Sequence, residues 1–117
     1  MAHNFKELNV WNDSMLLTKT VYSRTQIFPP EERFGLTAQM RRCAVSIPSN
    51  IAEGAGRSSN KEFVRFLDIA IASAYELETQ VLLSIDFEYI KENALEIINL
   101  INSVQKMLIG LKKTIVV

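Results

Sequence analysis

The sequence predicts an all-α fold, an antiparallel up-down-up-down four-helix bundle that forms a single domain over residues 1–117. Apolar residues recur every three to four positions through four segments of the chain, which is the period of an amphipathic helix. The connections between these segments are short, as is typical of helices that pack antiparallel to their sequence neighbours. No segment alternates between apolar and polar residues as a half-buried strand does.

The first predicted helix carries a wide apolar stripe. Its members are Leu8, Val10, Trp11, Met15, Leu17, Val21, Tyr22 and Phe28. The helix should stop at Phe28, because Pro29 and Pro30 follow and proline lacks the amide hydrogen that a helix needs. Residues 29–35, which are rich in charge and end in glycine, are expected to form the loop to the second helix.

The second predicted helix begins near Thr37, a good amino-terminal cap, and ends at the Gly-Ala-Gly of residues 54–56. Its apolar face consists of Leu36, Met40, Cys43, Ala44, Ile47, Ile51 and Ala55. Pro48 lies inside this pattern, where it removes one hydrogen bond and crowds the carbonyl four residues earlier. The apolar spacing continues in phase beyond it, so we expect one continuous helix; the alternative is two short helices broken at Ile47.

Two capping boxes predict the starts of the last two helices. Ser59 followed by Glu62 begins the third helix. Its core stripe consists of Phe63, Phe66, Leu67, Ala70, Ala74, Leu77, Val81 and Ile85. The pattern breaks near residues 89–92, after which Asn93 with Glu96 begins the fourth helix. Its stripe consists of Ile97, Ile98, Ile101, Val104, Met107, Leu108 and Leu111.

The composition is that of one globular domain with a substantial core, because 48% of the residues are apolar. The 13 basic and 13 acidic residues cancel, so binding to nucleic acid or a membrane would need a local patch. Residues 36–65 contain five basic residues against two acidic ones, whereas residues 66–99 contain seven acidic residues against Lys91 alone. Such segregated charge can serve self-association as readily as RNA binding.

Cys43, the single cysteine, lies among apolar helix positions and cannot form an internal disulfide. We therefore expect a buried thiol in a reducing compartment. No charged-then-apolar leader opens the sequence, and no apolar run approaches the ~18 residues of a membrane span. These features together predict a cytoplasmic protein.

The sequence offers no catalytic or metal-binding constellation. His3 is the single histidine, so neither a Ser/His/Asp nor a Cys/His arrangement is expected. Residues 54–56 end a helix, whereas phosphate-binding glycine loops precede one. Glu76 and Glu78 point to different faces, and no histidine follows a glutamate at the spacing of a di-metal bundle. We expect no enzymatic activity, no cofactor and no metal.

A row of polar side chains follows one face of the second helix. The row consists of Arg42, Ser46, Ser49, Glu53 and Arg57, with Asn50 at its edge. It can be a solvated face on which Glu53 pairs with Arg57. Alternatively, its small residues let another helix or subunit approach, and the third helix supplies polar partners across the contact. The candidate interface residues are then Arg42, Asn50, Glu53, Glu76 and Gln80.

A nucleic-acid interface would depend on the basic residues near the turn between the second and third helices. The candidates are Arg41, Arg42, Arg57, Lys61 and Arg65. The same charges can instead keep the protein soluble or pair between subunits. Phe63 and Phe66 belong to the core stripe, so no aromatic residue among these cations suggests base stacking.

Several motifs of the chain resemble one known family. They are residues 34–42 (FGLTAQMRR), 46–54 (SIPSNIAEG), 57, 61–63 and 76–80. These motifs are similar to those of the four-helix bundle proteins encoded in bacterial 23S rRNA intervening sequences, and SIPxNIAEG is a specific signature. Further pairs that fit the same family pattern lie at residues 10–11, 21–22 and 28–29. The resemblance spans most of the chain.

The resemblance implies an antiparallel bundle that assembles with itself into a ring-like homo-oligomer, a pentamer in the known cases. Similar bundles act as accessory proteins of diversity-generating retroelements, where a basic surface engages nucleic acid and a reverse transcriptase. Ribosomal or other structured RNA, or an RNA-processing protein, are therefore expected partners. This sequence departs from those bundles in having no net positive charge, which counts against RNA binding, and in having Ala72 where glycine is frequent.

From these observations we predict a non-enzymatic homo-oligomer that binds RNA or a ribonucleoprotein. The alternative is a structural or protein-interaction module that makes no contact with nucleic acid.

Overall fold

The structure is a computed structural model that describes residues 4–117. Over that range it contains the α-helices α1 (Asn9–Thr25), α2 (Leu36–Ala55), α3 (Asn60–Asp86) and α4 (Ala94–Thr114), with short 3-10 turns at η1 (Phe5–Glu7) and η2 (Pro30–Glu32). Each helix packs closely against its sequence neighbours, and α4 packs back against α1, whereas the backbones of the diagonal pairs stay further apart. The prediction of an all-α four-helix bundle is confirmed.

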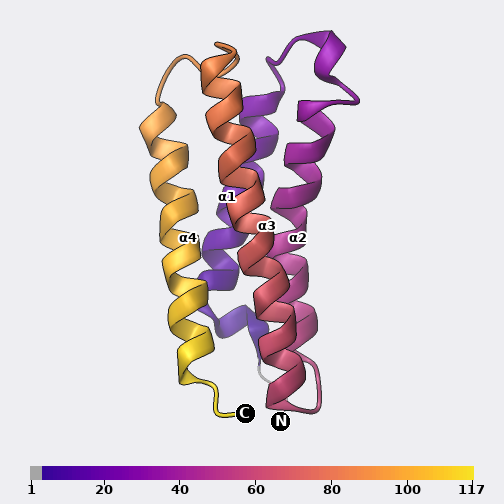
Figure 1. Cartoon of the computed structure of the whole chain (residues 1–117), viewed down its shortest axis with the longest axis vertical. Coiled ribbons are helices and arrows are strands. Elements are labelled where there is room, and N and C mark those ends of the chain that lie inside the picture. Colours follow the sequence, from indigo (N-terminus) through magenta and orange to yellow (C-terminus); the bar gives the residue numbers. More distant parts are fainter. Residues whose placement is uncertain (1–3) are drawn as a thin grey trace.

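Successive helices run in opposite directions along an elongated molecule of 45 × 25 × 20 Å (Figure 1). The α1–α2 and α3–α4 connections lie together at what we call the upper end. The α2–α3 turn and the carboxyl terminus lie at the opposite, lower end. The two ends therefore carry different segments of the chain.

The core lies between the four helices. Its largest fully buried side chains include Leu17, Val21, Met40, Ile47, Ile51, Phe63, Leu67, Leu77, Ile97, Ile101 and Leu108. Each such side chain contributes about 1.5–3 kcal/mol of apolar transfer free energy. The stripes predicted for the last three helices are largely buried, but the one predicted for the first helix was too wide. In α1 the side chains of Trp11 and Met15 are only half-buried, and Tyr22 is exposed.

The first helix is shorter than predicted, because α1 ends at Thr25 rather than at Phe28. The Thr25 hydroxyl donates to the Val21 carbonyl at 2.8 Å, and the Phe28 amide turns back to the Thr25 carbonyl at 3.2 Å. Phe28 is buried in the core although the chain has already left the helix.

The second helix is continuous through Pro48, as predicted. Proline has no amide hydrogen, so the Ala44 carbonyl lacks its usual helical donor. The Thr18 hydroxyl of α1 lies 3.0 Å from the Ala44 carbonyl oxygen and donates to it. The α1 helix therefore supplies a hydrogen-bond donor to the carbonyl that Pro48 leaves without one. This contact helps the bundle to tolerate Pro48 inside α2.

Of the three predicted caps, only Ser59 is confirmed; its hydroxyl accepts a hydrogen bond from the Glu62 amide at 3.2 Å. The Thr37 prediction was wrong, because the Glu32 carboxylate in the preceding loop accepts from the Leu36 amide at 3.1 Å. The second capping box was also wrong. Asn93 has a left-handed backbone with φ 55°, and its side chain makes no capping hydrogen bond.

By length and composition alone, α4 is long and apolar enough to cross a membrane. The expectation that no apolar run approaches that length was therefore wrong. In the bundle, α4 is one of the four packed helices, and its buried residues Ile97, Ile101, Val104 and Leu108 face the core. A core helix of a globular protein passes the same test.

Candidate interaction surface

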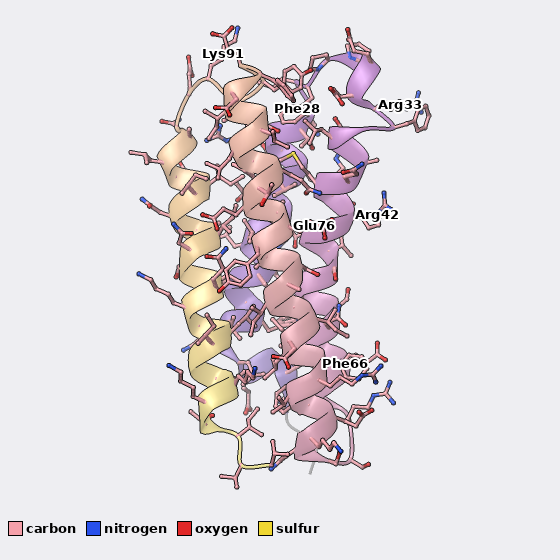
Figure 2. All side chains as sticks on the ribbon, in the orientation of Figure 1. Phe28, Arg33, Arg42, Phe66, Glu76 and Lys91 are labelled. Atoms are coloured by element: carbon pink, nitrogen blue, oxygen red, sulfur yellow. The ribbon has the colours of Figure 1, made fainter. Side chains whose placement is uncertain are left out.

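The structure gathers the predicted interface residues on the side of the bundle where α2 and α3 meet. We call this surface the α2–α3 face and define it by Gln39, Arg42, Ser46, Asn50 and Glu53 on α2 and by Ile69, Ser73, Glu76 and Gln80 on α3. Figure 2 labels Arg42 and Glu76 at similar heights on the two adjacent helices. The five predicted residues, which are far apart in sequence, therefore belong to one surface.

A short polar chain links the two helices at the centre of the face. The hydroxyl oxygens of Ser46 and Ser73 lie 2.9 Å apart. The Asn50 side-chain amide donates to the Ser46 carbonyl at 2.7 Å and lies 3.0 Å from the Ser46 hydroxyl. Asn50 thus fixes the serine that contacts α3, and it is used inside the protomer.

Gly54 allows a second close approach between α2 and α3 nearer the lower end. A Cβ atom built on Gly54 would lie 2.7 Å from the Phe66 Cβ and 3.0 Å from the Phe63 Cδ1. Both distances are shorter than ordinary van der Waals contact, so a side chain at this position would push the helices apart. The last glycine of the SIPSNIAEG motif is therefore explained by packing.

A hollow of about 400 Å³ lies in the middle of the face. Its lining consists of Gln39, Arg42, Cys43, Ser46, Ser73 and Glu76. Neither Arg42 nor Glu76 forms an ion pair within residues 4–117. The hollow therefore presents a cationic and an anionic group that form no ion pair within the described residues.

Cys43 and Gln80 lie beside this hollow. Burial, and then the nearby Glu76 carboxylate, raise the pKa of the Cys43 thiol to about 11. The thiol is therefore protonated at neutral pH, in agreement with the predicted unreactive cysteine. The Oε1 atom of Gln80 is buried and has no hydrogen-bond partner within the described part of the chain. A buried acceptor without a donor costs about 1–3 kcal/mol.

Of the five predicted RNA-binding residues, Arg41 and Arg42 lie apart from the other three and from each other. Its guanidinium lies 4.6 Å from the centre of the Tyr22 ring, and its Nε donates to the Thr25 hydroxyl at 2.9 Å. Arg41 therefore points toward α1, whereas Arg42 lines the hollow beside α3. Consecutive helix residues are separated by about 100° around the helix axis, so these two side chains diverge.

The other three predicted basic residues lie around the lower end. Arg57 pairs with Glu53 at 2.7 Å, as in the first of the two alternatives for this polar row, and Arg65 pairs with Glu62 at 3.7 Å. Both guanidiniums also lie over the Phe66 ring, at 4.8 and 5.6 Å from its centre. Lys61 is exposed and forms no ion pair within the described residues. Phe66 is thus a core residue that also stacks against two cations.

Two basic residues that sequence reasoning missed belong to the same lower end. Lys112 and Lys113 occupy the last turn of α4, which ends beside the α2–α3 turn (Figure 1). The Lys112 ammonium pairs with Asp68 of α3 at 2.7 Å. A basic last turn is visible in the sequence, but only the antiparallel topology brings it to the end of the bundle that also carries the α2–α3 turn.

Within residues 4–117 no group of three or more histidine, cysteine, aspartate or glutamate side chains could hold a metal ion. His3 lies outside the described residues.

Comparison with known proteins gives a family and a related structure. The model of the family described as 23S rRNA-intervening sequence protein matches residues 6–110. A solved structure from Bacteroides thetaiotaomicron, described as a protein with unknown function from the S23 ribosomal protein family, is 28% identical. The match covers 89% of this chain and 95% of that chain, with a TM-score of 0.81. A search of curated proteins gives no match.

Proposed function

The chain belongs to the 23S rRNA-intervening sequence protein family, and on that premise we propose that it is a non-enzymatic interaction protein that assembles with copies of itself. The proposal depends on the charged groups of the α2–α3 face that form no ion pair within the described residues. This face combines unpaired charges on Arg42 and Glu76 with the buried, unpartnered Gln80 oxygen. A second copy packed against the face would cover Arg42 and Glu76 and could offer each of them a partner of opposite charge.

Exposed apolar side chains support the same assignment. Ile69 is 39% exposed on α3, next to the hollow, and Leu83 is 41% exposed further along the same helix. A patch that mixes apolar side chains with a few polar groups is typical of a protein interface. The family resemblance implies a ring, and we propose a cyclic homo-oligomer, with the pentamer as the expected form.

Cyclic symmetry would place the lower ends of all copies on the same side of the assembly. Each lower end carries Arg57, Lys61, Arg65, Lys112 and Lys113 against Glu53, Glu62 and Asp68, a local excess of two positive charges. A ring multiplies this excess by its number of copies. We propose that the resulting basic surface binds the phosphates of structured RNA.

Two variants with matched exposure test self-association. Ile69 lies on the α2–α3 face and is 39% exposed, whereas Val45 is 41% exposed and lies one turn from Arg41, on the α1 side of α2. Ile69→Glu should lower the mass measured by sedimentation equilibrium, because it places a charge in the contact. Val45→Glu should leave the mass unchanged. Equal masses for both variants and the wild type would contradict the proposed interface.

Titration of a labelled ribosomal RNA fragment at two salt concentrations tests the RNA proposal. Binding through phosphates weakens steeply with salt, and Lys61→Glu should weaken it further. Lys19→Glu on the exposed side of α1 is the control with the same charge change. Absence of binding at low salt, with the assembly intact, would rule out the RNA proposal.

That outcome would favour the second candidate function, a protein-interaction module that makes no contact with nucleic acid. The observation in its favour is that Arg57, Arg65 and Lys112 are already paired with carboxylates. Together with the zero net charge, these pairs reduce the positive potential available to phosphates.

A further inference from the structure

The upper end of the bundle exposes apolar side chains that the core does not use. Phe34 is 86% exposed, Ile27 is 81% exposed and Leu95 is 73% exposed. All three lie in or beside the α1–α2 and α3–α4 connections. Single exposed apolar residues are ordinary, but several at one end of a small protein indicate a binding surface.

The same end is acidic. Residues 24–36 and 86–96 contain six acidic residues against three basic ones, a net charge of −3. The acidic residues are Glu31, Glu32, Asp86, Glu88, Glu92 and Glu96. None of them forms an ion pair within the described residues. The upper end is therefore opposite in charge to the lower end.

The basic residues of the upper end do not neutralise these carboxylates. Arg24 donates to the backbone carbonyls of Glu92 and Asn93, both at 2.6 Å. The Arg33 guanidinium lies over the exposed Phe34 ring at 5.3 Å. Lys91, labelled at the top of Figure 2, is exposed and forms no ion pair within residues 4–117.

A hollow of about 690 Å³ at this end brings Ile27 together with two of the carboxylates. Ile27, Pro29 and Tyr89 supply apolar surface, and Glu88 and Glu92 supply carboxylates. Arg24 and Lys91 also line it, but the Arg24 guanidinium is bound to backbone carbonyls. The loop that forms its wall is held in shape, because Arg24 binds two of its carbonyls and the Tyr89 hydroxyl donates to Glu32 at 3.0 Å. A rigid wall lowers the entropic cost of binding.

We propose that the upper end binds a lysine- or arginine-rich segment of a protein partner. An aliphatic side chain of that segment would pack on Ile27, and its cations would pair with Glu88 and Glu92. Charge complementarity selects this occupant, because an acidic surface repels the phosphates of RNA and attracts a basic peptide. The proposal goes beyond self-association and RNA binding, and it requires neither of them.

The test uses a short fluorescein-labelled peptide of lysines interrupted by leucines, titrated with the full chain in a fluorescence polarisation assay. The wild type should bind it, and a peptide with glutamine in place of lysine should not bind. Glu88→Lys combined with Glu92→Lys should weaken binding by about fivefold or more, because each exposed pair contributes a few tenths to 1 kcal/mol. Ile27→Ser should weaken it by about threefold or more.

Glu7→Lys is the control, because Glu7 is an exposed carboxylate of η1, away from the hollow. It should change the affinity by less than about twofold, since surface pairs act over short distances at physiological salt. Circular dichroism verifies that each variant is folded. Equal weakening by Glu7→Lys, or unchanged binding by the upper-end variants, would overturn the proposal. The upper-end variants lie away from the α2–α3 face and from Lys61, so this test can fail while the assembly and RNA tests succeed, and the reverse.

Discussion

The Thr18 hydroxyl donates to the carbonyl of Ala44, 3.0 Å away on the neighbouring helix. Ala44 is the residue whose carbonyl Pro48 leaves without an amide donor. Thr18 shares its single hydroxyl proton with the Ser14 carbonyl of its own helix, at 2.8 Å. The contact therefore ties α1 to α2 and compensates in part for a proline in the middle of a helix.

A double-mutant cycle tests this compensation. Thr18→Val removes the hydroxyl with little change of shape and should lower the free energy of unfolding by about 1 kcal/mol. In a Pro48→Ala background the new amide can satisfy Ala44, so the same change should cost much less. Urea denaturation of the four proteins measures the coupling free energy. Equal costs in both backgrounds would show that Thr18 does not compensate for the proline.

Gly54 and Gly110 are expected to respond to alanine in opposite directions. A methyl group at Gly54 would approach Phe66 to 2.7 Å, whereas one at Gly110 would meet nothing within 4 Å. Gly54→Ala should lower the free energy of unfolding by about 1–3 kcal/mol through overpacking. Gly110→Ala should raise it by about 0.5–1 kcal/mol, because alanine is the better helix former. Thermal or urea denaturation of the two variants tests both the predicted loss and the predicted gain of stability.

The Cys43 thiol is expected to react slowly in the native protein. Its pKa rises from 9.0 to about 11, first through burial and second through Glu76. A rise of this size reduces the thiolate fraction at pH 8 about 100-fold. A chromogenic disulfide reagent should therefore modify the native protein far more slowly than the urea-unfolded protein. Similar rates in the two states would contradict the buried thiol.

The same shift predicts the direction of a pH effect on stability. The folded state holds the thiol proton more tightly than the unfolded state, so the unfolded state loses its proton first as the pH rises. The stabilising contribution is complete below pH 9.0 and is lost progressively toward pH 11. Urea midpoints across that range should fall less steeply in Cys43→Ala. If the urea midpoint falls equally steeply with pH in Cys43→Ala, the loss of stability comes from groups other than the Cys43 thiol.

The helices and most of the core could be predicted from the sequence, because the spacing of apolar residues and the positions of prolines are patterns within each segment. The cap of α3 could be predicted for the same reason, because Ser59 and Glu62 are only three residues apart. The errors at α2 and α4 arise from side chains outside the helix concerned. Glu32 in the preceding loop caps the Leu36 amide, and Arg24 of α1 binds the carbonyls of residues 92 and 93, in the loop where Asn93 adopts a left-handed backbone and caps nothing. No local pattern could reveal those partners.

The candidate interface could be predicted as a set of residues because polar side chains recur on one face of a helix. The basic surface could be predicted only in part. Arg41 was misplaced because its contact with Tyr22 depends on how α1 packs against α2. Lys112 and Lys113 were missed because they reach the lower end through the antiparallel return of α4. The acidic upper end likewise combines two connections that are distant in the sequence.

The central claim is that the chain assembles with copies of itself, and sedimentation equilibrium of the wild type at micromolar concentration tests it most directly. Self-assembly predicts a mass several times the 13.3 kDa of one chain, with five copies as the expected form from the family resemblance. It also predicts that this mass falls in Ile69→Glu and not in Val45→Glu. A wild-type mass of 13.3 kDa across the micromolar range would contradict the claim.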